Sequence, residues 1–163
     1  PGGGQLDVGD AFDFVGASAF SVELWATPAL TSSFQNVAEK RAFDGGAADG
    51  WVLYFNSVDG GMAEVQFEQP AWGAADQRVA WSEIDGAARP LHVVVTYDSS
   101  QGIRLYVNDV RTANAFDADG GPIANGIALT LLGGYTGMLD ELAIYDHALS
   151  QDRVAAHFHA AGR

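Results

Sequence analysis

The chain has 163 residues, of which 48% are hydrophobic, and 21 acidic against 8 basic side chains produce a net charge of −13. This length and apolar content predict one globular domain over residues 5–163, preceded by a glycine-rich linker remnant at 1–4. The negative charge argues against nucleic acid and anionic membrane surfaces as partners. The chain has no run of about 18 apolar residues that could insert into a membrane, and the absence of cysteine excludes disulfides and zinc–thiolate sites.

Short segments with alternating apolar and polar residues recur along the chain. In the first clear one, FSVELWATP, Val22 and Leu24 share one face while Glu23 and Trp25 share the other. Turns rich in glycine, aspartate and serine, such as DGGAADG and DSSQG, separate the segments. About ten short strands of this kind predict an all-β antiparallel sandwich or jelly roll. The later strand segments, in chain order, are GWVLYFNS, MAEVQFEQ, QRVAWSEI, LHVVVTYD, GIRLYVND, IALTLLGG and GMLDELAIYDHALS.

The last segment, SQDRVAAHFH, is predicted to form a helix. Ser150 is a good N-cap, and Asp152 in the first turn interacts favourably with the helix dipole. Leu149 and Val154 occupy the two positions of a hydrophobic staple. Because Val154 and Phe158 are four residues apart, they would lie on one side of the helix and pack it onto the sandwich.

Three stretches, QLDVGDAFDFVGASAFSVELWATP, LHVVVTYDSSQGIRLYVND and GMLDELAIYDHALSQDRVAAHF, follow one another along most of the chain. The last is similar to the closing signature of laminin G-like (LamG-like) jelly-roll domains of the concanavalin A-like superfamily, in which a G-x-IDEV-x-IY-x-x-ALS strand runs into a short helix. The other two resemble the opening strands and the central hairpin of that family. Asn108 and Asp109 stand where the family often has Asp-Gly, and both residues tolerate the positive φ of a hairpin turn. The resemblance implies a two-sheet antiparallel jelly-roll sandwich with one short C-terminal helix.

Catalytic activity has to be argued from the residues, because this fold hosts lectin-like modules, adhesion modules and glycosidases alike. In WSEIDG, Glu83 and Asp85 match the first two positions of the Glu-x-Asp-x-(x)-Glu run of laminarinase-type hydrolases. The third carboxylate would stand at position 87 or 88, but both are alanine, and the mechanism fails without a proton donor. The four histidines fit no serine–histidine triad, so we predict no enzymatic activity.

Aspartates near both ends of the chain point to a possible calcium site. Calcium takes about six to eight oxygen ligands from carboxylates and loop carbonyls. The resemblance implies a structural calcium ion where the first strand meets the last, with ligands from the closing strand and from LDVGDAFD. The expected ligands are the carboxylates of Asp140, Asp7 and Asp10, with Asp13 also available, and the carbonyl of Gly9.

Asp140 is the best candidate among these ligands because of its place in the closing strand. Strict alternation puts Asp140 on the more apolar face with Leu142 and Ile144, where a carboxylate needs a partner. Glu141 would then face solvent. The alternative is that Asp140 makes only a backbone or turn hydrogen bond.

Tryptophans are the candidates for ligand contact, because sugars stack on flat rings. Trp72 stands in EQPAWGAADQ, a loop in which no alternation assigns it to the core, and Trp51 and Trp81 are further candidates. The alternative for Trp72 is a plug that covers the edge of the sandwich. Trp25 matches the strand tryptophan of the family and is predicted to be structural.

These observations predict a non-catalytic recognition or adhesion module of a larger extracellular or cell-surface protein. Its partner would be a glycan or a cell-surface protein, bound through loops, and it would adjoin further domains of the same chain. A structural spacer that binds nothing is the alternative, and a glucanase-type hydrolase is the least favoured one because the third carboxylate is missing.

Overall fold

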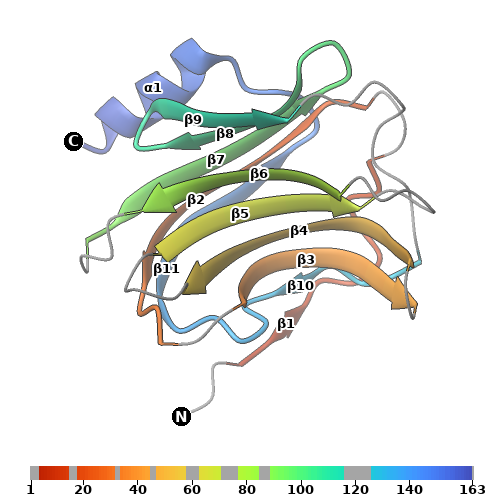
Figure 1. Ribbon diagram of the computed structural model, residues 1–163. Coiled ribbons are helices and arrows are strands. Elements are labelled where there is room, and N and C mark those ends of the chain that lie inside the picture. Colours follow the sequence, from red (N-terminus) through yellow and green to blue (C-terminus); the bar gives the residue numbers. More distant parts are fainter. Residues whose placement is uncertain are drawn as a thin grey trace.

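The computed structural model describes residues 4–14, 18–31, 34–44, 47–57, 63–70, 77–84, 89–115 and 126–162, and every structural statement below concerns this part of the chain. Its side chains are described except those of 42–49, 63–70, 77–81 and 113–115. Two antiparallel sheets face each other, and a helix lies outside them (Figure 1). This arrangement confirms the predicted two-sheet sandwich with a short C-terminal helix.

The first and last strands belong to different sheets. The six-stranded sheet has the order β1-β10-β3-β4-β5-β6, and the five-stranded sheet has the order β11-β2-β7-β8-β9, so β11 is an edge strand beside β2. The six-stranded sheet consists of β1 (Leu6–Asp7), β3 (Gln35–Asp44), β4 (Ala47–Ser57), β5 (Ala63–Pro70), β6 (Gln77–Ile84) and β10 (Thr130–Leu131). The five-stranded sheet consists of β2 (Phe20–Pro28), β7 (Leu91–Asp98), β8 (Gly102–Val107), β9 (Val110–Ala115) and β11 (Gly137–Tyr145), and helix α1 (Gln151–Ala160) follows it.

The hydrophobic core fills the space between the two sheets. Val22 and Leu24 of β2 are fully buried in it, as the alternation of that strand predicts, and Val93 and Val95 of β7 lie beside them in the same cluster. Burial of each such side chain stabilises the fold by roughly 1.5–3 kcal/mol. The odd-numbered residues of β2 therefore point away from the core.

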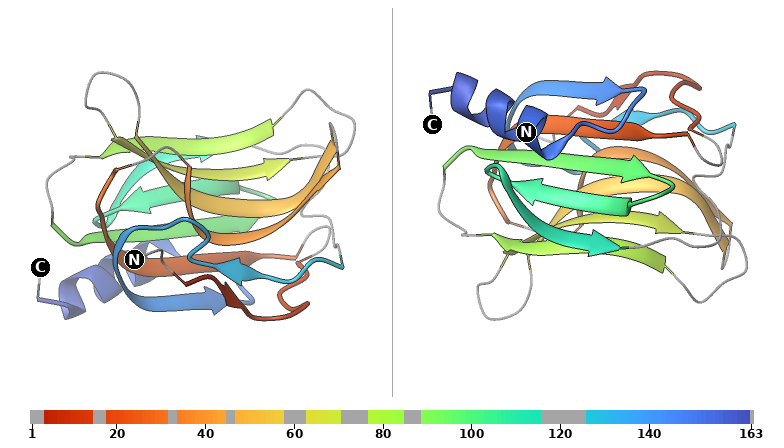
Figure 2. Two further views of the ribbon diagram at one scale, coloured as in Figure 1. Left: turned by 90° about the horizontal axis from the view of Figure 1, so that it is seen from below. Right: turned by 90° about the horizontal axis from the view of Figure 1, so that it is seen from above.

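Helix α1 packs on the outer face of the five-stranded sheet (Figure 2). The Oγ atom of Ser150 accepts a hydrogen bond from the backbone N–H of Arg153 at 3.3 Å, which confirms the predicted N-cap. Val154 is fully buried and clusters with Leu149 and with Val94 of β7. The staple residues thus anchor the start of the helix to the sheet.

The hairpin between β8 and β9 has the predicted two-residue turn. Asn108 and Asp109 adopt positive φ angles of 51° and 65°. The side-chain oxygen of Asn108 also accepts a hydrogen bond of 3.0 Å from the backbone N–H of His92. This bond joins the turn to the start of β7. Asn108 therefore has two roles: it adopts the positive φ that the turn requires, and its side chain links the turn to the neighbouring strand.

Candidate ligand-binding groove

A groove runs between β11 and α1 on the outer face of the five-stranded sheet. It consists of two adjoining depressions of about 290 and 510 Å³ that share Trp25, Glu141 and Ala161. Volumes of this size are typical of small-ligand sites. We call this feature the β11–α1 groove, and its ionisable and aromatic lining consists of Glu23, Trp25, Asp140, Glu141, Tyr145 and His157.

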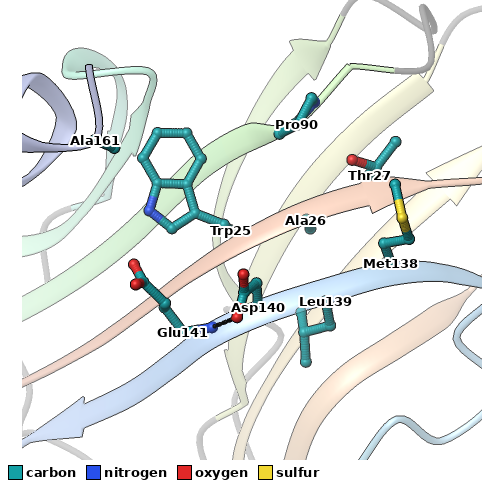
Figure 3. Close-up of a pocket in the computed structure, with 9 residues that line it drawn as sticks. All are labelled: Trp25, Ala26, Thr27, Pro90, Met138, Leu139, Asp140, Glu141 and Ala161. Atoms are coloured by element: carbon teal, nitrogen blue, oxygen red, sulfur yellow. Dashed lines mark hydrogen bonds between the residues drawn. The ribbon is translucent and has the colours of Figure 1, made fainter. Parts of the chain in front are cut away.

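Trp25 lies in the floor of the groove and lines both depressions (Figure 3). Its ring packs against the imidazole of His92 from the sheet, with centroids 4.7 Å apart, and against the ring of Phe158 from the helix, at 5.9 Å. These contacts support its predicted structural role. The indole is nevertheless only partly buried, so it also offers rigid apolar surface to a ligand.

Glu23 lies next to Trp25 in the floor and is only 6% exposed. Its carboxylate accepts hydrogen bonds from His92 Nε2 at 2.7 Å, from the Tyr145 hydroxyl at 2.6 Å and from His157 Nδ1 at 3.0 Å. Burial alone would raise the pKa of Glu23, but the hydrogen bonds from His92, Tyr145 and His157 outweigh it and lower the pKa to about 2. Glu23 is therefore an ionised anchor that ties β7, β11 and α1 to β2.

The donors to Glu23 are also constrained by it. Burial and the hydrogen bond to Glu23 raise the pKa of Tyr145 to about 12, so this hydroxyl keeps its proton. His92 is fully buried, and its Nδ1 has no hydrogen-bond partner in the described structure. His92 is thus a buried residue whose Nε2 is hydrogen-bonded to Glu23 and whose ring packs against Trp25 and Phe158.

A β-bulge in β11 forms the groove wall opposite the helix. Asp140 pairs with Trp25 and Ala143 with Glu23, so the strand carries an extra residue between these pairs. Glu141 has a φ of +50°, and Asp140 Oδ1 accepts a hydrogen bond of 3.0 Å from the backbone N–H of Glu141. This bond is the turn-type hydrogen bond that the sequence left open as the alternative role of Asp140.

The bulge reverses one prediction about the closing strand. Leu142 and Ile144 pack against the core, and so does Leu139, whereas Asp140 is exposed and lines the groove. The expectation that Asp140 shares an apolar face with Leu142 and Ile144 is therefore wrong. An extra residue shifts the alternation by one position, and the strand sequence alone does not reveal it.

The four expected calcium ligands do not form one site in the described structure. Asp140 lies on the outer face of the five-stranded sheet, whereas Asp7 belongs to β1 in the other sheet, where its Oδ1 accepts the backbone N–H of Gly9 at 2.8 Å. No group of three or more His, Cys, Asp or Glu among the described residues has the arrangement of a metal site. As a set these donors do not fit a calcium ion, and calcium stays a prediction of the resemblance.

A lysine ammonium occupies the acidic N-terminal loop instead. Lys40 Nζ lies 2.8 Å from Asp10 Oδ1 and 3.1 Å from Asp13 Oδ1, and it donates to the carbonyl of Ile127 at 2.6 Å. The hydrogen bond from Lys40 holds the pKa of Asp10 below its usual value. Lys40 is 2% exposed and is the only lysine of the chain, which was the available signal for this cluster. The chain thus supplies these carboxylates with a positive charge of its own.

The predicted tryptophan contacts have three different outcomes. Trp51 is 2% exposed and belongs to the core cluster, where its ring packs against Phe20, so its proposed role in ligand binding is wrong. Trp72 lies outside the described residues. Trp81 pairs with Gln66 in the sheet, but its side chain lies outside the described part.

Of the two acids considered for catalysis, the structure describes one. Glu83 is exposed on β6, and Asp85 lies outside the described residues. Within the described ranges, no helix has the length and apolar character needed to cross a membrane.

Comparisons with known proteins agree with this fold. The profile of the concanavalin A-like lectin/glucanases superfamily matches residues 1–155. No curated protein sequence matches the chain significantly. Among solved structures, the binding domain of Paraclostridial Mosquitocidal Protein 1 superposes with a TM-score of 0.68 at 14% identity, over 96% of this chain and 41% of that one.

Two further structures are similar over most of the chain. The CBM40 module of the Ruminococcus gnavus IT-sialidase, bound to α2,3 sialyllactose, has a TM-score of 0.68 at 15% identity and covers 87% of this chain and 83% of its own. The binding domain of botulinum neurotoxin DC, in complex with rat synaptotagmin II, has a TM-score of 0.61 at 12% identity, over 88% of this chain and 36% of that one. The chain spans less than half of the length of the two toxin domains. The chain belongs to the laminin G-like family of the concanavalin A-like lectin/glucanases superfamily.

Proposed function

We propose that this chain is a non-catalytic recognition module that binds a glycan through the β11–α1 groove. The observation that carries the proposal is the partly exposed ring of Trp25, held by two other rings beside the carboxylates of Asp140 and Glu141. A sugar ring presents a C–H face that can pack on an indole, and hydroxyl groups that can donate to carboxylates. The groove offers both kinds of contact on a rigid sheet.

The similar structures support a binding role. They are binding domains of two toxins and the CBM40 module of a sialidase. The CBM40 module is bound to sialyllactose, and one of the toxin domains is in complex with synaptotagmin II. At identities of 15% or less these likenesses concern the fold, so the ligand of this chain has to be argued from its own residues. By analogy with these modules, we propose that the chain is part of a longer extracellular protein.

The chemistry of the described residues favours binding over catalysis. Glu23 is already saturated by its three donors, and His92 and His157 are the histidines that donate to it. Glu83 is exposed on the other sheet, away from this cluster. The two exposed acids of the groove, Asp140 and Glu141, are adjacent in one strand and lie on the same wall, whereas a glycosidase needs two carboxylates that flank the scissile bond, so a bound sugar would be held and not cleaved.

The test is a glycan array followed by calorimetry with the best neutral or charged oligosaccharide found. We expect Trp25→Ala to weaken binding by at least about tenfold, because it removes the apolar floor of the groove. Since Trp25 also packs against His92 and Phe158, Asp140→Asn serves as a second variant that leaves these rings in place. Glu83→Gln, an exposed acid on the other sheet, is the matched control.

The same experiment separates the groove from the loop that the sequence favoured. Trp72→Ala should leave the affinity unchanged if the groove is the site. Loss of binding in Trp72→Ala, with Trp25→Ala and Asp140→Asn unaffected, would move the site to the loop. If no glycan on the array binds, the result would instead favour a structural spacer.

A further inference from the structure

The charge of the β11–α1 groove is one-sided. Among the described residues that line it, Glu23, Asp140 and Glu141 are acidic and none is a lysine or an arginine. His157 is hydrogen-bonded to Glu23. Arg153 of α1 acts electrostatically on Tyr145, which lines only the larger depression.

The three acids differ in how well the protein itself satisfies them. Glu23 is nearly buried and receives hydrogen bonds from three other residues, so little of its charge is left for a ligand. Asp140 and Glu141 are exposed, and in the described part of the chain neither forms an ion pair. Their charge is therefore available at the smaller depression.

Trp25 lies between these two carboxylates and the helix (Figure 3). The face of an indole attracts cations through its quadrupole, and the attraction grows when the cation leaves water. Carboxylates and an indole on one depression therefore favour a cation, whereas an anionic group would be repelled by both. The half-buried Thr27 and the exposed Met138 also line this depression, and neither carries a charge.

We propose that the groove selects glycans with free amino groups, that is, oligosaccharides of amino sugars that are not acetylated. The protonated amine would donate to Asp140 and Glu141 while the ring of the same sugar packs against Trp25. This inference rests on the proposed glycan-binding function and narrows it to a cationic ligand. It also separates this chain from the CBM40 module, which holds the anionic sialyllactose.

The test compares three tetrasaccharides of equal length by calorimetry with the full chain at mildly acidic pH. They are the glucosamine tetramer, the N-acetylglucosamine tetramer and the neutral glucose tetramer with the same linkage. We expect the glucosamine tetramer to bind at least about tenfold more tightly than the other two, and its affinity to fall as salt is added.

Variants locate the charge that is responsible. Asp140→Asn and Glu141→Gln keep side-chain shape and should each weaken binding of the glucosamine tetramer by about three- to tenfold, and binding of the neutral tetramers by a smaller factor. Glu83→Gln on the other sheet changes the net charge equally and should leave the affinity within about twofold, because distant surface charges are screened.

Each other outcome decides against the inference in a distinct way. Equal affinity for all three tetramers, lost in Trp25→Ala, would overturn the selectivity and leave the glycan-binding function standing. No binding of any tetramer or of any array glycan would overturn both. Binding of a lysine-rich peptide in place of the glucosamine tetramer would assign the groove to a protein partner. If Glu83→Gln and Asp140→Asn weakened binding of the glucosamine tetramer equally, the binding would depend on the net charge of the protein and not on the groove.

Discussion

The imidazole of His157 in α1 donates to the carboxylate of Glu23 in β2, with Nδ1 3.0 Å from one oxygen and 3.1 Å from the other. These residues are 134 positions apart in the chain. Their contact connects the last helix to the second strand, within the larger depression of the β11–α1 groove. An ionised carboxylate therefore helps to hold the helical wall of the groove on the sheet.

Acid should weaken the fold through Glu23. Its pKa is lowered from the ordinary 4.5 to about 2, so folding favours the ionised form. This contribution, about 3 kcal/mol, is complete above about pH 4.5 and is lost as the pH falls towards 2. Urea unfolding over this range should show a steeper loss for the wild type than for Glu23→Gln, with Glu83→Gln as the exposed control. Parallel pH profiles for the wild type and Glu23→Gln would contradict this account.

Removal of the carboxylates around Lys40 should destabilise the fold, and removal of the lysine as well should restore part of the loss. In the double variant Asp10→Ala/Asp13→Ala, a nearly buried ammonium loses both carboxylates, and we expect a clear loss in the free energy of unfolding. Adding Lys40→Met to this variant should restore part of the loss, because no buried charge remains. Denaturant unfolding of the three proteins measures the effect, and a further loss on adding Lys40→Met would refute it.

Gly137, the first residue of β11, should not tolerate a side chain. Its φ is 140°, and a Cβ atom there would lie 2.2 Å from the carbonyl oxygen of Thr27. We expect Gly137→Ala to lower the free energy of unfolding by about 2–4 kcal/mol, because the clash is with backbone. Gly126→Ala is the control, since a Cβ at that position has no neighbour within 4 Å. Similar melting temperatures for the two variants would show that β11 can shift without cost.

Calcium should change the stability little. The resemblance predicts a site with Asp140 and the N-terminal aspartates, but Lys40 is paired with Asp10 and Asp13, and Asp140 lies on the outer face of the other sheet. We expect the same melting temperature, within about 1 °C, in calcium and in chelator. A clear rise with calcium that Asp140→Ala abolishes would restore the site that the resemblance predicts.

Local patterns predicted most of the secondary structure. Alternation in β2, the two-residue turn at Asn108 and Asp109, and the cap of α1 at Ser150 all depend on neighbours in the chain. These features were confirmed because a strand, a turn or a helix cap is specified within a few residues.

The tryptophans show where local patterns are insufficient. Both faces of β4 are apolar, with Trp51 and Leu53 on one side and Val52 and Tyr54 on the other, so alternation could not tell which face meets the core. Packing of the opposite sheet decided that Trp51 is buried. Trp25 could not be recognised as a groove residue, because its surroundings come from a strand and a helix far along the chain.

The sequence by itself determined the family, the two-sheet architecture and the terminal helix, because these are encoded in periodicity and in short contiguous stretches. The tertiary structure alone decided the groove. The bulge at Glu141 moved Asp140 from the expected inner face to the outer one, and the helix placed His157 on Glu23. Both depend on packing between segments that are distant in the sequence, and such packing leaves no local pattern to read.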